Sequence, residues 1–460
     1  MKRINIKTLN QKYSEFENKQ VKVCGWARTI RDSKNIAFIE LNDGAFKSCQ
    51  IVVQSDKISN YSEVVSQLTG ASFEIVGTVV LTPNAKQPYE INADNIIIMG
   101  TSAGDYPLQK KGHSLEFLRE KNYLRPRTNT FNAVFRIRSV AAYAIHKFYQ
   151  ERDFVYCNTP IITSSDCEGA GSMFQVTSLD LDKVAQYGKV DYSKDFFGKK
   201  VFLTVSGQID EEPMTHAFCN TYTFGPTFRA EKSNTTRHAA EFWMMEPEMC
   251  FTDLEGLMDH EEEMIKNVIS YVMENCKDEL NFLNNFVDKS LLDRLNNVVS
   301  NQFVRLSYTD AIEILEKEKN NFEFPVEWGV DLQSEHERYL TEKVFKKPVF
   351  LYNYPKDIKA FYMKQNTDEK TVAAVDLLVP GIGELCGGSQ REENYDKLLN
   401  RMIELGLNPE EYKNYLETRK YGATIHSGFG LGFERFVMYL TGISNIRDVE
   451  YCPRTVGSIN

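Results

Sequence analysis

The 460-residue sequence predicts an α+β protein, with a small N-terminal β barrel followed by a larger domain whose mostly antiparallel sheet is flanked by helices. Three observations predict this. Short β-rich runs separated by turn residues fill residues 21–99, helical periodicity appears from residue 134, and strand-like runs joined by hairpin turns return after residue 200. This order is not a β–α–β alternation, so a doubly wound nucleotide-binding sheet is not expected.

The barrel is predicted from five β-rich runs with turn signals such as Asp-Gly and Pro-Asn between them, at 21–30, 36–41, 49–53, 72–81 and 89–99. A helical stretch near 61–68 lies between the third and fourth runs. This arrangement is typical of an OB-type barrel, which commonly binds single-stranded nucleic acid through aromatic faces. Phe38 is the candidate stacking residue, and Gln50 is placed to read a base edge. A buried Phe and a surface Gln are the alternative interpretation.

The predicted domains are the barrel at 1–102, a linker at 103–125 and the larger domain at 126–460, with a mostly helical insertion at about 275–345. A helix over 134–148 leads into a strand-like run at 154–163. Pro160 within this run suits a sheet edge or an interface. Thr252 and Glu255 have capping-box spacing at the start of a long amphipathic helix.

Composition narrows the class of protein. The net charge of −10 argues against a protein that coats DNA or other nucleic acid nonspecifically, and the mild positive charge lies in the first 100 residues. The longest aliphatic runs are too short to cross a bilayer. The nine cysteines include no CxxC pair and are interpreted as reduced packing residues. We therefore expect a cytoplasmic enzyme without a membrane partner.

Residues 224–249 are predicted to form a strand, a polar loop and a returning strand. Such a hairpin can present Arg229, Glu231, His238 and Phe242 to one small ligand. The cluster suits a nucleoside triphosphate, because cations bind phosphate oxygens, a carboxylate accepts from the adenine amino group, and an aromatic ring stacks on the base. The alternative is an ordinary hairpin with a solvated, charged tip.

Two further segments fit the same ligand. Arg435 follows a glycine-rich strand at the start of the last helix and adds positive charge, while Asp376 and Glu384 lie on adjoining strands and offer oxygen ligands for Mg²⁺. Each is ambiguous alone, since Arg435 could be a surface charge and the two acids could be solvated. Glycines at 428, 430 and 432 match neither the dinucleotide fingerprint nor the P-loop.

Together these segments resemble a known family. Residues 131–163, 221–249 and 428–435 resemble the three signature motifs of class II aminoacyl-tRNA synthetases, and residues 168–174, 328–340, 354–363 and 380–393 resemble the bacterial asparaginyl branch. The resemblance implies an antiparallel catalytic sheet and a homodimer formed through the Pro160 segment. It implies ATP with adenine stacked on Phe242, the α-phosphate on the catalytic residue Arg229, the γ-phosphate on Arg435 and His238, and Mg²⁺ on Asp376 and Glu384.

The resemblance also indicates which residues bind the amino acid and which amino acid is the substrate. It places Arg391 against the side-chain oxygen, and Gln208 and Glu168 near the α-amino group. Aspartyl enzymes typically carry a lysine shortly after the residue matching Gln208, whereas this chain continues Ile-Asp-Glu-Glu. L-asparagine and tRNA(Asn) are therefore the expected substrates. The stretch 210–214 departs from the usual asparaginyl pattern.

In the resembling family the barrel binds the tRNA anticodon, which assigns Phe38, Gln50 and Arg28 to that contact. Three alternatives remain at this point. They are an aspartate-activating or relaxed ligase, a tRNA-independent asparagine synthetase on the same fold, and a catalytically silent paralogue.

Overall fold

A computed structural model describes residues 1–109, 111–167 and 172–459. The chain divides into two compact units, Met1–Ala133 and Val134–Asn460, and the boundary falls inside helix α4 (Asn129–Gln150). No helix within the described ranges has the length and apolar character needed to cross a membrane.

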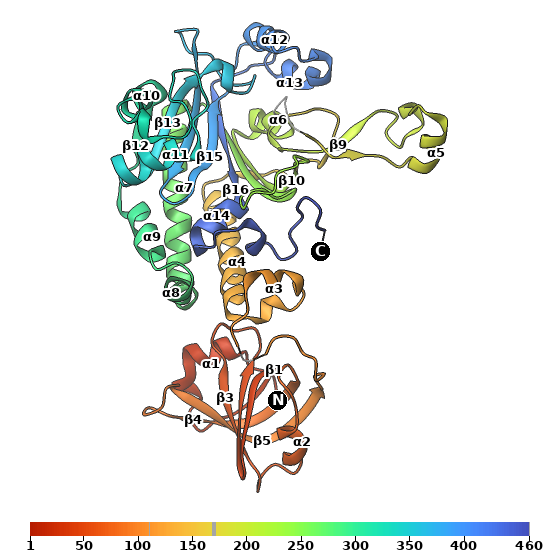
Figure 1. The fold of residues 1–460 in the computed structure, drawn as a ribbon, viewed down its shortest axis with the longest axis vertical. Coiled ribbons are helices and arrows are strands. Elements are labelled where there is room, and N and C mark those ends of the chain that lie inside the picture. Colours follow the sequence, from red (N-terminus) through yellow and green to blue (C-terminus); the bar gives the residue numbers. More distant parts are fainter. Residues whose placement is uncertain (110, 168–171, 460) are drawn as a thin grey trace. The chain divides into compact units, whose positions relative to one another are not determined.

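The first unit contains a closed barrel with the strand order β1-β2-β3-β5-β4, which confirms the five-stranded prediction (Figure 1). Its strands are β1 (Gln20–Ser33), β2 (Ile36–Asn42), β3 (Cys49–Gln54), β4 (Ser72–Leu81) and β5 (Tyr89–Gly100), with α1 (Ile6–Lys12) before them, α2 (Tyr61–Val65) between β3 and β4, and α3 (Leu115–Glu120) after them. Strand alternation decides what the barrel exposes. Ala37, Ile39 and Leu41 of β2 are buried inside, so Phe38 is on the outer face.

The second unit is built on an eight-stranded sheet with the order β12-β13-β14-β15-β16-β11-β10-β6. The six central strands pair antiparallel, and only the edge pairs β12–β13 and β10–β6 are parallel. The strands are β6 (Val155–Tyr156), β10 (Asn220–Phe228), β11 (Glu241–Cys250), β12 (Val304–Ser307), β13 (Val349–Pro355), β14 (Thr371–Val379), β15 (Gly383–Gln390) and β16 (His426–Gly432). The predicted antiparallel sheet is confirmed.

A second, three-stranded sheet has the order β7-β9-β8, from β7 (Ile162–Thr163), β8 (Gln175–Val176) and β9 (Val201–Leu203). The remaining helices are α5 (Leu181–Tyr187), α6 (Gln208–Phe218), α7 (Leu254–Asn275), α8 (Lys277–Phe286), α9 (Leu291–Ser300), α10 (Tyr308–Glu316), α11 (Ser334–Arg338), α12 (Tyr395–Glu404), α13 (Lys413–Thr418) and α14 (Phe433–Thr441). Residues 275–345 thus hold mainly helices, but they also supply β12 to the edge of the main sheet.

Helix α7 packs its Leu, Met, Ile and Val stripe against β14, β15 and β16. The capping box predicted at Thr252 is wrong. Asp253 caps the helix instead, by accepting from the backbone N–H of Gly256 at 2.9 Å, while the Thr252 hydroxyl donates to the Cys250 carbonyl. The sequence pattern was ambiguous by one position because Thr and Asp are both good capping residues.

Glu261 on α7 is fully buried beneath the sheet, beside the buried Cys386 of β15. Within the described part of the chain, neither of its carboxyl oxygens has a hydrogen-bond partner of normal geometry. Burial raises the pKa of Glu261 to about 8, and the charge of Asp376 adds to this while the Cys386 thiol opposes it. Glu261 therefore stays protonated in the folded protein at neutral pH.

This burial predicts a pH-dependent stability. In the unfolded chain Glu261 ionises near its ordinary value of 4.5, whereas in the folded protein it ionises near 8. Between these values only the folded state holds the proton, so the group lowers the free energy of unfolding by about 1.4 kcal/mol for each unit that pH rises. Glu261→Met should remove this contribution. The free energy of unfolding, measured with urea, should therefore fall less steeply with rising pH in the variant than in the wild type between pH 5.5 and 7.5. Glu274→Met, on the exposed side of α7, is the control, and parallel curves for wild type and Glu261→Met would contradict the prediction.

Candidate active site

The predicted hairpin is confirmed as β10 and β11, which pair from Asn220–Met249 to Phe228–Glu241. Arg229 follows the last residue of β10, and its backbone N–H donates to the Ala240 carbonyl at 3.0 Å. The guanidinium carbon of Arg229 lies 5.5 Å from the centre of the Phe242 ring. The hairpin thus brings a cation and an aromatic ring together at its loop end, next to residues 229–240.

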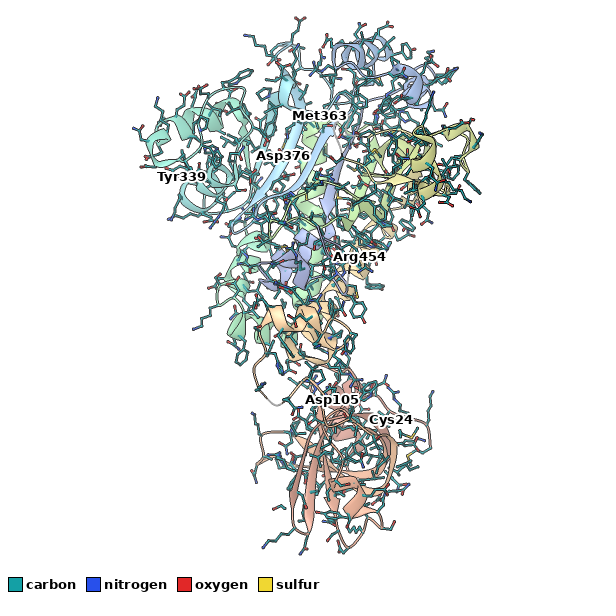
Figure 2. The ribbon with its side chains drawn as sticks, turned by 45° about the vertical axis from the view of Figure 1, so that its right-hand side comes forward. Cys24, Asp105, Tyr339, Met363, Asp376 and Arg454 are labelled. Atoms are coloured by element: carbon teal, nitrogen blue, oxygen red, sulfur yellow. The ribbon has the colours of Figure 1, made fainter. Side chains whose placement is uncertain are left out.

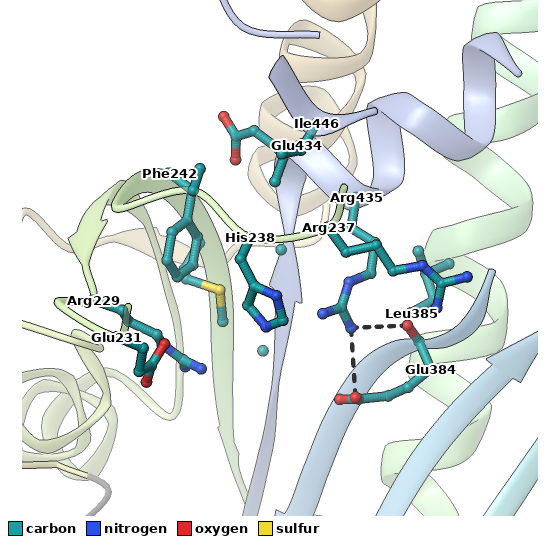
Figure 3. Close-up of a pocket in the computed structure, with 14 residues that line it drawn as sticks. Arg229, Glu231, Arg237, His238, Phe242, Glu384, Leu385, Glu434, Arg435 and Ile446 are labelled. Carbon is teal, nitrogen blue, oxygen red and sulfur yellow. Dashed lines mark hydrogen bonds and ion pairs between the residues drawn. The ribbon is translucent and has the colours of Figure 1, made fainter. Parts of the chain in front are cut away.

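A cavity of about 170 Å³ lies at this end of the hairpin. It is lined by all the residues predicted to bind the nucleotide: Arg229, Glu231, His238, Phe242 and Arg435. In Figure 3 Phe242, Arg229 and Glu231 lie on one side, Arg237 and Arg435 lie on the other, and His238 is between them. Arg435 extends from the first turn of α14 and donates to the Glu384 carbonyl at 3.0 Å.

The electrostatic field in this first cavity is positive. Burial, and then the charge of Arg435, hold the pKa of His238 below its ordinary value, with Arg229 and Arg237 acting in the same direction. Burial and the neighbouring Arg435 likewise lower the pKa of Arg237. Because Arg229, Arg237 and Arg435 line one cavity, a bound anion would offset the unfavourable effect of their charges on Arg237 and His238. Arg237, which also lines this cavity, was not among the residues predicted from the sequence.

A second cavity of about 240 Å³ adjoins the first, and the two share Arg229, Met244, Glu384 and Gly430. This second cavity brings together Gln208, Arg391, Asp376 and Glu384 from the predicted set. It also contains residues that sequence reasoning missed: Ser206, Glu246, Lys359 and Tyr362. Arg229 therefore stands where the two pockets meet.

Arg391 is held rigidly in the second cavity. Its guanidinium forms a buried ion pair with Glu248, with Nε donating to Oε1 at 3.2 Å, and Nη1 donates to the Ser389 hydroxyl at 2.8 Å. Glu246, two residues before Glu248, is also buried and accepts from the Ser206 hydroxyl and from the Gly207 N–H at 3.0 Å. A fixed cation and a fixed carboxylate thus line one small cavity.

Alternation along β11 places Phe242, Met244, Glu246 and Glu248 on one face. The signal for Glu246 and Glu248 was therefore present in the sequence, as two acids spaced by two in an apolar strand. Lys359 gave no such signal because it lies outside any strand or α-helix.

Gln208 begins α6, and its amide donates to Oε1 of Glu212 at 2.9 Å. Glu212 is fully buried and also accepts from Arg419 at 2.6 Å, and its Oε2 lies 3.1 Å from Nε2 of His426. Burial alone would raise the pKa of Glu212, but Arg419 and His426 hold it well below its ordinary value. The unusual stretch 210–214 remains helical, and its Glu212 anchors a buried charge cluster behind Gln208.

Asp376 and Glu384 converge on Gly387, and Figure 2 labels Asp376 and Met363, which both line this pocket. A Cβ at Gly387 would lie 3.2 Å from Oδ1 of Asp376 and 3.3 Å from Oε1 of Glu384, so the bare glycine leaves room between the two carboxylates. The other Asp376 oxygen accepts from Lys359 at 2.6 Å.

Excess negative charge surrounds these two acids. Burial, and then the Glu384 carboxylate, raise the pKa of the adjacent Glu337 to about 7. In the described ranges no cluster of three or more His, Cys, Asp or Glu has the arrangement of a metal site. Two convergent carboxylates are nevertheless the kind of protein ligands that Mg²⁺ prefers, because this ion usually takes only one or two carboxylates from the protein.

The three residues predicted to bind an anticodon lie together on the first unit. Phe38 of β2 pairs with Val52 of β3, and Gln50 is opposite Glu40, so Phe38 and Gln50 are diagonal neighbours on the outer face. Gln50 donates to Glu90 at 3.2 Å. Arg28 is half-buried at the bulge of β1, hydrogen-bonded to Asn129.

Two predicted residues stand apart. Glu168, expected near the α-amino group, lies outside the described residues. Pro160 is exposed in the connection between β6 and β7, and the next two residues, Ile161 and Ile162, are large exposed apolar side chains.

Comparisons with known proteins match this architecture. Residues 114–456 match the family model of class II tRNA synthetases (D, K and N), and residues 21–99 match an OB-fold nucleic acid binding domain. The sheet, the hairpin and the paired pockets are thus those of a class II tRNA synthetase.

The relatives narrow the family further. The asparagine–tRNA ligases of Clostridium kluyveri and Clostridium acetobutylicum are 60% and 61% identical over 460 residues, covering 100% of this chain and 99% of each relative. An asparaginyl-tRNA synthetase from Pyrococcus horikoshii, solved with asparaginyl-adenylate, is 30% identical with a TM-score of 0.87, covering 100% of this chain and 99% of that one. An aspartyl tRNA synthetase from Entamoeba histolytica, at 23% identity, shares the fold. The chain belongs to the asparagine–tRNA ligase family.

The buried cluster behind Gln208 yields a prediction. Arg419→Met leaves the Glu212 carboxylate buried without its cation, which should cost about 3–5 kcal/mol in the free energy of unfolding. The KM for asparagine should rise as well, because Glu212 orients Gln208. Arg338→Met breaks an exposed pair with Glu342 and should cost at most about 1 kcal/mol. Urea unfolding measures the loss of stability, and asparagine-dependent exchange of pyrophosphate into ATP measures the change in KM. Equal losses in Arg419→Met and Arg338→Met would contradict the prediction.

Proposed function

We propose that this protein joins L-asparagine to tRNA(Asn) in two steps, with ATP as the energy source. Asparagine and ATP first form asparaginyl-adenylate and pyrophosphate, and the asparaginyl group then passes to the 3′-terminal adenosine of the tRNA. The observation that carries the proposal is the pair of pockets that meet at Arg229. Asparaginyl-adenylate, which the Pyrococcus horikoshii relative binds, joins a nucleotide to an amino acid at one phosphate and so needs such a pair.

Adenylate formation follows from charge and position. The α-carboxylate of asparagine is the nucleophile and attacks the α-phosphorus of ATP, so the reaction needs no protein base. Arg229 binds the α-phosphate oxygens as charge develops on them, and Arg435 with His238 binds the γ-phosphate of the leaving pyrophosphate. Phe242 stacks on the adenine, and Glu231 accepts from its amino group.

Mg²⁺ is the proposed metal, and Asp376 and Glu384 are the residues that would hold it. When bound, it neutralises phosphate charge. Lys359 already neutralises one Asp376 oxygen, which leaves the oxygen facing Gly387 for the metal.

The choice of asparagine is attributed to Arg391 and Glu246. An amide presents one acceptor and two donors, whereas a carboxylate only accepts. Arg391 donates to the side-chain oxygen, and Glu246 accepts from the side-chain NH₂. Aspartate would place a carboxylate against Glu246, and a buried like-charge contact disfavours it. Gln208 and Glu168 bind the α-amino group.

The barrel is proposed to bind the anticodon. Phe38 stacks on an unpaired base, Gln50 reads its edge, and Arg28 supplies positive charge. Two copies of the chain are proposed to pair through the Pro160 segment, which would cover Ile161 and Ile162. A ligase that supplies translation acts where ribosomes are, so the cytoplasm is the proposed location.

Arg229→Ala should abolish asparagine-dependent exchange of pyrophosphate into ATP. The loss should be about 10²-fold or more, because a preorganised donor to the reacting phosphate is removed. Wild-type protein should exchange with asparagine and not with aspartate. Near-normal exchange by the variant would refute the role of Arg229, and exchange with aspartate alone would refute the proposed substrate.

Phe38→Ala should weaken tRNA charging and leave pyrophosphate exchange intact. One lost base stack is worth about 1–3 kcal/mol, so the KM for tRNA should rise about tenfold. Ile97→Ala removes an exposed apolar side chain from β5 of the same barrel and is the matched control. Equal losses in charging and exchange would show that the barrel has another role.

A further inference from the structure

An exposed aromatic turn stands apart from every residue assigned above. Residues 172–203 leave the main sheet beside β10 and form a projection built from β8, α5 and β9 (Figure 1). A turn shortly before β9 in the chain carries Phe196 and Phe197, whose side chains are 79% and 47% exposed. Turn positions usually hold small or polar residues, so two adjacent exposed phenylalanines need an explanation.

The turn is built to hold these rings in place. The Asp195 carbonyl accepts from the Gly198 N–H at 2.9 Å and closes the turn, in which Gly198 has a φ of +63°. The buried Asp195 carboxylate accepts from the Ser178 N–H at 2.9 Å, from the Phe196 N–H at 2.8 Å and from the Thr177 hydroxyl at 2.7 Å. The two rings contact each other edge to face, with centroids 4.8 Å apart.

Three lysines lie next to the rings in the sequence. Lys194, Lys199 and Lys200 flank the turn and are exposed. Each lysine makes one contact at the surface. Lys194 pairs with Asp191 at 3.4 Å, and Lys199 donates to the Ser164 hydroxyl at 3.1 Å. Lys200 lies over the Phe202 ring. Asp195, the acid within the turn, is already engaged by its own hydrogen bonds. Exposed rings with adjacent lysines suit unpaired nucleotides, which stack on the rings while the lysines contact phosphates.

Both ends of the projection are attached to the segment that carries Arg229. The Ser172 carbonyl accepts from the Ala230 N–H at 2.7 Å, and the Thr204 carbonyl accepts from the Phe228 N–H at 2.9 Å. Phe174, at the base, is also exposed. The projection therefore rises directly from the strand end where the adenylate forms, and this is where the single-stranded 3′ end of the tRNA has to arrive.

We propose that the turn at Phe196 and Phe197, with Lys194, Lys199 and Lys200, binds the acceptor end of the tRNA by stacking on its unpaired nucleotides. The inference rests on the proposed function and adds to it a tRNA contact separate from the barrel.

The test compares Phe196→Ala with Phe286→Ala, a control that removes an equally exposed ring (76%) at the end of α8. The substrates are a tRNA(Asn) transcript and an acceptor-stem minihelix, which has the 3′ end but no anticodon. Phe196→Ala should raise the KM for both RNAs about tenfold without altering asparagine-dependent pyrophosphate exchange. Phe196→Trp should restore charging, whereas Phe286→Ala should resemble wild type. Replacing Lys199 and Lys200 together with glutamine should reduce the slope of log affinity against log salt by about 1 to 2.

An unchanged KM for the minihelix in Phe196→Ala would overturn the inference and leave the proposed function standing. Dissociation of the variant into single chains, with charging and exchange falling together, would also overturn it, by showing that the turn contacts a second copy of the chain. Absence of asparagine-dependent exchange in the wild-type protein would instead refute the proposed function itself.

Discussion

The buried ion pair between Arg391 and Glu248 depends on glycines in the adjacent sheet strands, which leave space for the two side chains. Glu248 on β11 is opposite Gly428 on β16, and a Cβ at that glycine would lie 2.2 Å from Oε1 of Glu248. Next to it, a Cβ at Gly388 would lie 2.6 Å from that of Phe429. The glycine-rich strands therefore provide the space in which a charged pair crosses the sheet. This explains why their spacing matches no phosphate-binding fingerprint.

Burying so much charge is costly unless the partners are fixed, because each ion loses its hydration. The site meets this requirement with two linked sets of partners: Arg391 with Glu248, and Glu212 with Arg419 and His426. The Arg391 N–H also donates to the His426 carbonyl at 2.9 Å, which connects the sets through the backbone. A pocket whose charges hold one another in place discriminates between an amide and a carboxylate better than a mobile one, since neither ion can move to accommodate the wrong ligand.

The cations and the acids of the site lie at different places on the sheet. Cations and an aromatic ring gather at the loop end of the β10–β11 hairpin, whereas acids gather where β14 and β15 meet, and Arg229 stands at the junction. In the proposed reaction two substrates lie end to end across this junction, and catalysis then comes from position and electrostatics. Both ends of the projection over residues 172–203 are hydrogen-bonded to the segment that carries Arg229.

Alternation and turn residues are local signals, so the sequence was enough to predict the barrel, the antiparallel sheet and the β10–β11 hairpin. It also pointed to Arg229, His238, Phe242 and Arg435 together through their motifs. Only the tertiary structure identified Lys359 as the partner of Asp376, and Arg419 and His426 as partners of Glu212. These contacts join residues 17, 207 and 214 positions apart, and no local pattern encodes which distant side chains share a buried space. The helix cap at Asp253 was missed for the opposite reason, since two adjacent residues carry the same local signal and only backbone geometry chooses between them.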